Sequence, residues 1–429
     1  MNKRPFLSIL IISILITAIL PACKTTETVP PPIPFETRQA ATIAAQSDAT
    51  ATPLPTQATP TSTDPTPTLE PQEAASPTPT TEAQPLMTSP DYGIQAFLWW
   101  RPEVATRDLG LIKDMGFRWV KQVFAWVDIE GADKGHFNWT QSDQVVHHAN
   151  DYGIKILARL DRAPTWTGAQ PPNGPPTNYE DFGDFCYAIA SRYKGQIQAY
   201  QIWNEPNLAR EWGGKPPNPE EYVQLLSVAY RRIKEADPDA LVISAGLTPT
   251  NTSNDQAMPD TVYLDRMYQA GFQNHCDMVG MHAAGFKAPP ELSPDELMAD
   301  PNLQYGDQRF FCFRHIEDMR AIMEKHGDYE RRVVILEFGW TIDPRTDSPY
   351  HWHAVTEEQQ ADYMVRAYQY AQEHWQPWIG LMSLIYIADE HWKGKEQERE
   401  EYWWAITKSN YPTPWLRPAY YALQEMPKK

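Results

Sequence analysis

Apolar runs and helical repeats alternate along the chain from Asp91 to its C-terminus. Several of the apolar runs are continuous, which is typical of parallel strands that other elements cover on both faces. We predict strands at residues 94–98, 119–124, 154–159, 199–203, 241–245, 278–282, 333–337 and 381–387. The pattern therefore predicts an α/β fold for residues 91–429.

Two of the intervening helices carry clear start signals. One begins at Asn218-Pro219, where asparagine is a favoured N-cap and proline is favoured in the first turn. The other begins at Thr356, and Gln359, three residues later, completes a capping box. Apolar residues of the first helix recur at helical spacing on one face, at Tyr222, Leu225, Leu226, Ala229 and Ile233.

The count of eight strands alternating with helices indicates one (β/α)8 TIM barrel. The alternative with the same alternation is a doubly wound open sheet. Neither GxGxxG nor GxxxxGK(S/T) follows the first predicted strand, so a nucleotide-binding fold has little support.

The first residues have the pattern of an export signal, which we assign to residues 1–22. Two basic residues precede an apolar run that ends at Leu20 and is too short to predict a membrane span. Leu20-Pro21-Ala22-Cys23 resembles the lipobox of a bacterial lipoprotein, and this resemblance implies cleavage before Cys23 and lipid attachment to its thiol. The alternatives are an uncleaved anchor and a plain signal peptide. Each places the rest of the chain outside the cytoplasm.

Residues 23–90 are rich in threonine and proline, with runs such as PTSTDPTPTLEP. Such a segment cannot bury enough apolar area to offset the entropy lost on ordering it. Its prolines favour extended polyproline geometry. We therefore predict a disordered tether between a lipid anchor and the barrel.

Charge and composition narrow the classes of partner. The formal net charge is −18 and no cluster of lysine and arginine stands out, so nucleic acid is not expected as a partner. The 16 Trp and 21 Tyr suit a carbohydrate groove, although they also suit a large core. Contact with a membrane is expected through the lipid anchor only.

Three cysteines follow Cys23, namely Cys186, Cys276 and Cys312. An odd number in an exported chain leaves at least one thiol unpaired within the chain. Pairing of Cys276 with Cys312 stays open, because the sequence does not give their separation. We favour buried, inert thiols. The spacing is not that of a metal site, so no zinc or iron–sulfur centre is predicted.

Two glutamates close predicted strands, where a charge needs a function. Glu205, within QIWNEPN, lies where a proline ends an apolar strand, and Glu337 ends VVILE. The C-terminal ends of barrel strands share one mouth, so we expect the two carboxylates to meet there. Cleavage of a glycosidic bond needs a proton on the leaving oxygen and stabilisation of the anomeric carbon, and two carboxyl groups supply both. Repulsion between them raises one pKa and so divides the roles.

Four segments resemble those of one group of enzymes. WNEP after the fourth strand and EFGW after the seventh are similar to the signatures of glycoside hydrolase clan A. Residues 126–143 and 156–166 resemble its second- and third-strand segments, closest to the cellulase-like and β-xylosidase-like families. The resemblance implies a retaining mechanism without metal or cofactor, with Glu205 as acid/base and Glu337 as nucleophile. It also implies that Asn204 binds the 2-hydroxyl of the sugar.

The chain departs from the clan pattern at three places. Many members carry an arginine on strand two that supports the nucleophile, whereas this chain has Lys121, which donates without a rigid fork. Strand six usually ends in His-x-Tyr, and here His282 is present but the tyrosine is missing. The tryptophan platform of strand eight is not evident, so Tyr386 or Trp392 is expected to serve instead. These departures admit unusual specificity or reduced activity.

Further residues near the predicted strand ends are candidates for the site. Trp166 and Trp340 are predicted sugar platforms, although a large aromatic residue more often serves in packing. Arg159 and Asp161 are expected to form an ion pair beside the site. Four acids are interpreted mostly as surface or rim charges: Glu130, Glu211, Asp389 and Glu390.

The sequence therefore predicts an exported, lipid-anchored glycosidase that cleaves O-glycosidic bonds, with β linkages favoured, in oligo- or polysaccharides. One alternative is a carbohydrate-binding surface protein that kept the barrel and lost catalysis, which the departures at strands two and six favour. A barrel aldolase would need a reactive lysine at a strand end, and Lys121 lies within a strand. The sugar, the choice between end-trimming and internal cleavage, and the oligomeric state stay open.

Overall fold

The structure is a computed structural model that describes residue 87 and residues 89–299, 305–396, 398–410, 412 and 415–428. These residues belong to one compact unit, Pro85–Lys429. The predicted export signal, the lipidation site at Cys23 and nearly all of the predicted tether lie outside the described residues. None of the helices in the described part of the chain has the length and apolarity needed to cross a bilayer.

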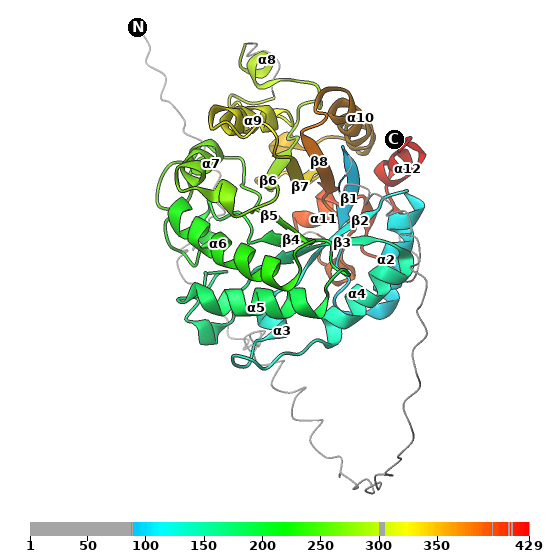
Figure 1. Ribbon diagram of the computed structural model, residues 1–429. Helices are drawn as coiled ribbons and strands as arrows, with labels where there is room; N and C mark the ends of the chain where they lie inside the picture. Colours follow the sequence, from blue (N-terminus) through cyan, green and yellow to red (C-terminus); the bar gives the residue numbers. More distant parts are fainter. Residues whose placement is uncertain are drawn as a thin grey trace, which may run out of the picture. The chain divides into compact units, whose positions relative to one another are not determined.

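Eight parallel strands form the centre of the unit, and helices surround them (Figure 1). The strand order is β5-β4-β3-β2-β1-β8-β7-β6. At the seam between β5 and β6, Ile243 bridges in parallel to Met278, which nearly closes the ring. The strands are β1 (Asp91–Gln95), β2 (Trp119–Val123), β3 (Lys155–Leu160), β4 (Ala199–Ile202), β5 (Leu241–Ile243), β6 (Val279–Ala284), β7 (Val333–Gly339) and β8 (Ile379–Leu384). The predicted (β/α)8 TIM barrel is confirmed.

The helices and short elements follow the strands along the chain. The helices are α2 (Pro102–Asp114), α3 (Trp126–Ile129), α4 (Thr140–Tyr152), α5 (Tyr179–Arg192), α6 (Pro219–Ala236), α7 (Asp260–Gln269), α8 (Pro294–Ala299), α9 (His315–Lys325), α10 (Glu357–His374), α11 (Glu401–Trp404) and α12 (Pro418–Glu425). Single 3-10 turns are η1 (Thr165–Thr167), η2 (Ala209–Glu211), η3 (Phe272–Asn274), η5 (His351–His353) and η6 (Glu390–Trp392). A small hairpin joins β9 (Thr407–Lys408) to β10 (Trp415–Leu416).

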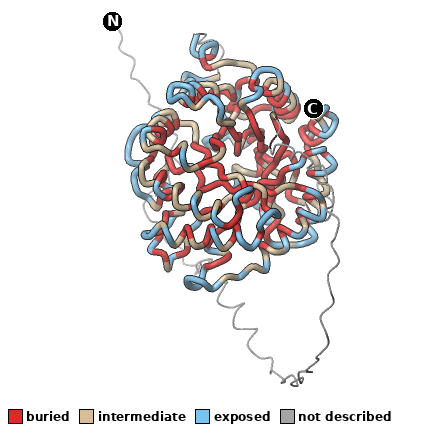
Figure 2. The backbone as a smooth tube through the Cα atoms, viewed as in Figure 1, coloured by how far each residue is buried: buried red, intermediate tan, exposed pale blue. Residues whose placement is uncertain are grey.

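The predicted helix starts are confirmed at both positions. The Asn218 side chain accepts a hydrogen bond from the Glu221 backbone N–H at 3.1 Å at the start of α6. Thr356 and Gln359 form the reciprocal capping box of α10. The five apolar residues predicted on one face of α6 are all buried. Buried residues occupy the strands and the inner helix faces, as Figure 2 shows.

The first strand differs most from its predicted range. It begins at Asp91, three residues before the predicted start, because Asp91 is buried and fully engaged. The Asp91 carboxylate accepts hydrogen bonds from Arg118 at 3.0 Å and from the Trp119 indole at 2.8 Å. An acid with such partners can enter a buried strand, but its partners cannot be recognised from local hydrophobicity.

The three cysteines of the described region are free and buried. Burial raises the pKa of the Cys276 and Cys312 thiols to about 12. The structure therefore decides the open question of a disulfide between Cys276 and Cys312 against pairing, and the preferred interpretation of buried, inert thiols fits their surroundings.

Candidate active site

The backbone around Glu205 is held in an uncommon conformation. Trp203 and Glu205, which follow β4, have positive φ values of 66° and 43°. Left-handed backbone at residues other than glycine costs free energy and is found mainly at functional sites. The buried Trp203 indole donates to the Glu211 carbonyl oxygen at 2.8 Å, and the Glu205 backbone N–H donates to Gly246 at 3.0 Å. These contacts fix the turn that directs the Glu205 carboxylate.

Glu337 lies within β7 beside a buried lysine from β2. Lys121 donates from Nζ to Glu337 Oε1 at 2.7 Å and to the Leu336 carbonyl oxygen at 3.2 Å. The pairing registers of β7 shift on both sides, between Met281 and His282 of β6 and between Ile335 and Phe338 facing β8. Such irregularities re-aim side chains in a sheet. Lys121, predicted in place of the usual arginine, thus reaches the predicted nucleophile.

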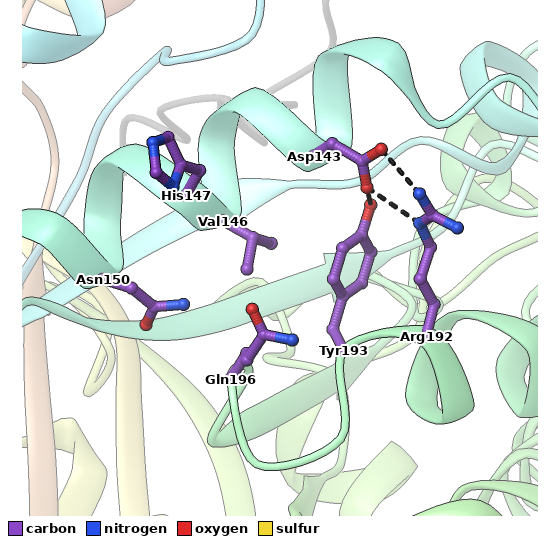
Figure 3. A pocket seen from close by; sticks show the side chains of 7 residues that line it. All are labelled: Asp143, Val146, His147, Asn150, Arg192, Tyr193 and Gln196. Carbon is purple, nitrogen blue, oxygen red and sulfur yellow. Dashed lines mark hydrogen bonds and ion pairs between the residues drawn. The ribbon is translucent and has the colours of Figure 1, made fainter.

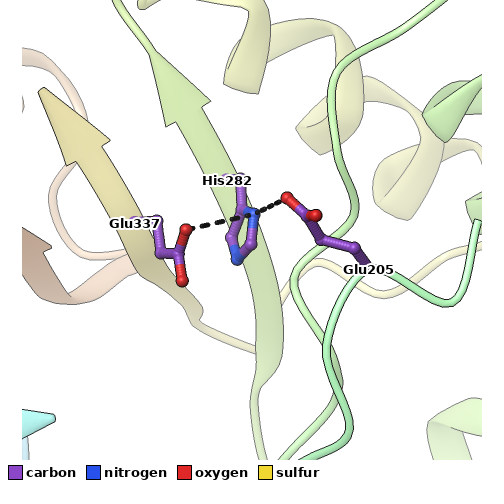
Figure 4. A group of neighbouring side chains, drawn as sticks. All are labelled: Glu205, His282 and Glu337. Atoms are coloured by element: carbon purple, nitrogen blue, oxygen red, sulfur yellow. Dashed lines mark hydrogen bonds and ion pairs between the residues drawn. The ribbon is translucent and has the colours of Figure 1, made fainter. Parts of the chain in front are cut away.

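His282 joins the two carboxylates, as Figure 4 shows. Its Nδ1 lies 3.0 Å from Glu205 Oε1 and 3.9 Å from Glu337 Oε2. One ligand atom from each of the three side chains lies within 4.8 Å of the other two. Gly246 makes room for the imidazole, because a Cβ there would collide with the ring. The carboxylates from β4 and β7 therefore meet in one place, as the sequence predicts.

Nearby positive charges keep both glutamates ionised. Burial would raise the pKa of Glu337, but the charges of Lys121 and His282 outweigh it and hold the pKa below its usual value. Burial also acts to raise the pKa of Glu205, but the hydrogen bond and charge of His282, with Arg210, lower it to about 2. An ionised carboxylate only accepts hydrogen bonds, so the proton between His282 and Glu205 is on Nδ1.

This trio is a group of metal-ligating side chains close enough to hold an ion. However, the Lys121 ammonium lies 2.7 Å from Glu337 and already supplies a positive charge there. A divalent cation would have to displace or face that ammonium, which like-charge repulsion opposes. The donor set therefore fits acid/base and nucleophilic chemistry better than metal binding.

Asn204 and Arg210 flank Glu205. Asn204 is buried, and its Oδ1 accepts a hydrogen bond from Gln201 Nε2 at 3.2 Å. Arg210 Nη2 lies 3.5 Å from Glu205 Oε2, and its side chain is 53% exposed. A contact this long and exposed is weak, so a ligand can displace it. Sequence reasoning missed Arg210, although it lies only five residues after Glu205.

The four predicted aromatic positions differ in their surroundings, and Trp392 is buried with its ring edge-on to Tyr386. The charges of Glu337 and Glu205 add to burial in raising the pKa of Tyr386, so Tyr386 lies at the site. Trp166 is partly buried and donates from its indole to the Glu130 carbonyl oxygen at 2.7 Å. Trp340 is fully buried and donates to the Ala288 carbonyl oxygen at 2.9 Å. Its ring is a packing element in this structure, so its burial does not fit the predicted platform.

The charged residues predicted near the site include one expectation that the structure confirms and one that it corrects. Arg159 and Asp161 form the predicted ion pair, with 2.5 Å between Nη2 and Oδ2. Glu130 was interpreted as a surface or rim charge, but that is wrong. It is buried, and its carboxylate accepts from the Trp126 indole at 2.6 Å and from the Gly135 N–H. A hydrogen-bonded buried acid looks like an exposed one in sequence, because its donors lie elsewhere.

Glu400, between β8 and α11, is a site neighbour that the sequence did not indicate. Burial, the charge of Glu401 and the charge of Glu205 raise the pKa of Glu400 to about 8, although Arg210 opposes them. Its Oε2 is buried without a hydrogen-bond partner. The loop that carries it has no strand signal or motif, so only the closed barrel brings it toward Glu205.

A separate surface pocket lies between α4 and α5 (Figure 3). Its lining residues belong to α4, the end of α5 and the turn before β4, and they include neither glutamate. Asp143 accepts from Arg192 at 2.6 Å and from the Tyr193 hydroxyl at 2.7 Å inside it. Its charged groups therefore satisfy one another, and we assign no site there.

Comparisons with known proteins agree with the barrel and with the sequence resemblance. Residues 95–182 match the family described as Beta-galactosidase, Glyco_hydro_42. This match covers the segment with Lys121 but neither Glu205 nor Glu337, and it covers less than half of the chain. No curated protein matches the chain.

Solved structures of glycosidases share the fold. A family 39 glycoside hydrolase from the gut symbiont Bacteroides cellulosilyticus WH2 has 18% identity and a TM-score of 0.56, over 78% of this chain and 62% of that chain. A glucosidase from Croceicoccus marinus has 13% identity and a TM-score of 0.55, over 79% and 66%. The xylanase XynB from Paenibacillus barcinonensis has 15% identity and a TM-score of 0.51, over 81% and 100%. The chain spans less than two thirds of the length of the first two. The chain is thus similar to the TIM-barrel glycosidases of clan A, in its fold and in the sequence of residues 95–182, which include β2 and β3.

Proposed function

We propose that the chain is a retaining glycoside hydrolase that cleaves β-linked O-glycosidic bonds, with Glu205 as acid/base and Glu337 as nucleophile. The observation that carries this proposal is the meeting of two carboxylates from β4 and β7 within 4.8 Å at the C-terminal end of the barrel strands. Retaining glycosidases hold their carboxyl groups about 5–5.5 Å apart, whereas inverting ones leave roughly 6.5–9.5 Å for a water molecule. The family match and the shared fold support the same class of reaction.

In this mechanism Glu337 attacks the anomeric carbon, and the glycosidic oxygen leaves with a proton from Glu205. Lys121 keeps Glu337 ionised, as a nucleophile requires. Glu205 must first gain a proton. It takes this proton from water before the substrate closes the site and carries it on Oε2, where the leaving oxygen replaces Arg210, while His282 Nδ1 lies 3.0 Å from Oε1. Exclusion of water by the substrate favours the neutral acid, because burial disfavours the charged form of a carboxyl group.

The first test removes each carboxylate in turn. Glu337→Gln should lower hydrolysis of aryl β-glycosides by roughly a thousandfold or more, since no covalent intermediate can form. Glu205→Ala should slow poor leaving groups by about 10²–10⁴-fold and be rescued by azide or by good leaving groups. Nuclear magnetic resonance of the first product formed should show retained anomeric configuration.

Glu373→Gln serves as the control, because Glu373 is an exposed acid on α10. It should behave as the unmodified protein does. Full activity in Glu337→Gln, or an inverted first product, would overturn the proposed mechanism.

The low pKa of Glu205 favours a second candidate function, which is carbohydrate binding without catalysis. The pKa of Glu205 is lowered to about 2, which favours a carboxylate that cannot donate a proton. A carbohydrate-binding protein on the same barrel would tolerate this. Heat of binding to oligosaccharides in calorimetry, with no turnover across a broad glycoside panel, would favour this second function over the enzyme.

We also propose that the barrel is exported and anchored by a lipid on Cys23, with residues 24–90 as spacer. The lipobox-like Leu20-Pro21-Ala22-Cys23 supports this proposal. Cells expressing the full chain should incorporate labelled fatty acid into it. Cys23→Ala should abolish the label and release the protein from the membrane fraction, and label retained in that variant would contradict the anchor.

A further inference from the structure

Two tryptophans stand exposed on loops that follow barrel strands. Trp100 lies between β1 and α2 and is 50% exposed, and Trp352 lies in η5 after β7 and is 39% exposed. Both loops leave the C-terminal ends of strands, so both rings are at the same end of the barrel as Glu205 and Glu337. A single exposed apolar residue is ordinary on a protein surface. The way these two rings are held is what distinguishes them.

Trp352 packs against three other aromatic side chains. Its ring centroid lies 4.9 Å from Phe311, 4.9 Å from His353 and 6.2 Å from Phe286, the last in a stacked arrangement. Phe286 itself has a positive φ of 51°, so the loop after β6 is held in a set conformation. A ring that is held in place loses little entropy when a ligand stacks on it.

The loop that carries Trp352 reaches the acid/base side of the site. Phe286, which stacks on Trp352, lies only four residues after His282. His282 Nδ1 lies 3.0 Å from Glu205 Oε1. In the proposed mechanism the leaving group departs on the Glu205 side. Trp352 is therefore placed to meet the sugar on the leaving-group side of the bond.

Trp100 is held over a different sector of the rim. The next residue, Arg101, pairs with Glu390 of η6 at 2.6 Å, and this ties the loop after β1 to the loop after β8. The Trp100 ring meets His391 edge-on, with centroids 6.3 Å apart. The loop after β8 begins with Ile385, whose backbone N–H donates at 3.2 Å to the carbonyl oxygen of Phe338, the residue after Glu337. Trp100 therefore adjoins the site along β1 and β8, whereas Trp352 adjoins it along β7.

We propose that Trp100 and Trp352 are stacking platforms for sugar units beyond the bond that is cleaved, so that the substrate is an oligosaccharide or polysaccharide chain. Indole rings present a flat face that suits the C–H face of a pyranose, and a charge-free contact of this kind tolerates many sugars. This inference rests on the proposed function of Glu205 and Glu337, and it adds the substrate class to it. A glycoside with one sugar unit would have no further unit to stack on either ring.

The test is the dependence of kcat/KM on chain length. The intact protein, Trp100→Ala and Trp352→Ala are compared on an aryl glycoside of one sugar and on β-linked oligosaccharides of two to six units. Each variant should lose kcat/KM by roughly two- to tenfold on the longer chains, and the loss should be smallest on the aryl glycoside. Trp352→Phe should recover part of the loss, because a flat ring remains. Equal losses on all substrates, or none on the longer chains, would overturn the inference.

A control and a binding measurement separate this inference from the proposed function. Tyr329→Ala removes an exposed aromatic residue shortly before β7, at the opposite end of the barrel, and should show no dependence on chain length. In the Glu337→Gln background, calorimetry with the same oligosaccharides should show weaker binding when Trp352→Ala is added. If no glycoside is hydrolysed but this binding difference persists, the catalytic proposal fails and the platforms stand. If hydrolysis is confirmed but binding ignores both tryptophans, the platforms fail alone.

Discussion

At the scale of single residues, Lys121 stands on strand two where many members of clan A have an arginine. It is fully buried, and its ammonium group contacts one oxygen of Glu337 at 2.7 Å. Burial lowers the pKa of Lys121, and the nearby Glu337 charge opposes that change. An arginine would present two parallel donors, whereas the lysine presents a point charge. Lys121 thus keeps Glu337 ionised without fixing both of its oxygens.

Replacing Lys121 tests this electrostatic role. Lys121 is the largest of the charges that lower the Glu337 pKa, so Lys121→Met should raise it. The nucleophile must be ionised, so the acidic limb of kcat/KM should move to higher pH by about one unit or more. Lys121→Arg keeps the positive charge and should leave the limb near its original position. A reduced rate with an unmoved acidic limb in Lys121→Met would show that the lysine acts by packing alone. The measurement is a pH–rate profile on one aryl glycoside.

At the scale of elements, a buried histidine connects the first turns of α7 and α9. His315 Nε2 lies 2.8 Å from Asp260 Oδ2 in α7, and its Nδ1 lies 3.2 Å from Asp318 Oδ2 in its own helix. Burial acts to lower the pKa of His315, but the two carboxylates outweigh it and raise the pKa to about 9. The cation also compensates two acids near helix N-termini, where carboxylates are favourable. An ion pair between His315 and Asp260 therefore links α9 to α7.

The contribution of His315 to stability should depend on pH. Its pKa is about 9 in the folded protein against a usual 6.5, so the folded state binds its proton more tightly. The stabilisation is complete below pH 6.5 and disappears as the pH rises through 9. Its full size is about 3 kcal/mol at 1.36 kcal/mol per pKa unit. Urea unfolding at pH 6 and pH 9.5 should show this loss in the intact protein.

His315→Gln is the matched variant for that experiment, since it keeps a hydrogen-bonding side chain but cannot carry the charge. It should be less stable at pH 6 and show a smaller fall in unfolding free energy between the two pH values. An unchanged fall in this variant would assign the pH dependence to other groups.

At the scale of the whole molecule, the barrel is closed most sparsely between β5 and β6. Named strand pairs join every other neighbour, whereas this seam depends on the bridge from Ile243 to Met278 and on short hydrogen-bonded contacts. The Gly280 N–H donates to the Ser244 hydroxyl at 3.0 Å across the same seam. The seam lies directly beneath His282, two residues after Gly280, so closure also positions the contact with Glu205.

A side chain at Gly280 should open this seam. A Cβ there would collide with the Ser244 carbonyl oxygen and crowd the Leu336 side chain. Gly280→Ala should lower the unfolding free energy by about 1–3 kcal/mol, the usual cost of overpacking. The control is Gly110→Ala on α2, where the nearest atom would be 3.8 Å away and alanine favours the helix by about 0.5–1 kcal/mol. Circular dichroism during urea unfolding measures both, and equal stability of the two variants would contradict a tight seam.

The fold was predictable because its strands carry their own signal. Continuous apolar runs predicted all eight strands, and the polar start signals of α6 and α10 depend on neighbours three residues away. Asp91 marks the limit of this reasoning. Its partners are Trp119, the first residue of β2, and Arg118, just before it, so a local pattern could not extend β1 to include Asp91. Elements are local in sequence, but satisfaction of a buried charge is not.

For the site, the sequence by itself determined that Glu205, His282 and Glu337 lie at or near the C-terminal ends of the fourth, sixth and seventh strands, because each is beside an apolar strand pattern. Only the tertiary structure decided that His282 lies between the two acids, that Lys121 reaches Glu337, and that Arg210 lies 3.5 Å from Glu205. It also decided that Trp340 is buried while Trp100 and Trp352 are exposed. The physical reason is common to all of these. Burial, charge and pKa depend on distances through space, which the closed barrel sets between residues that the chain keeps far apart.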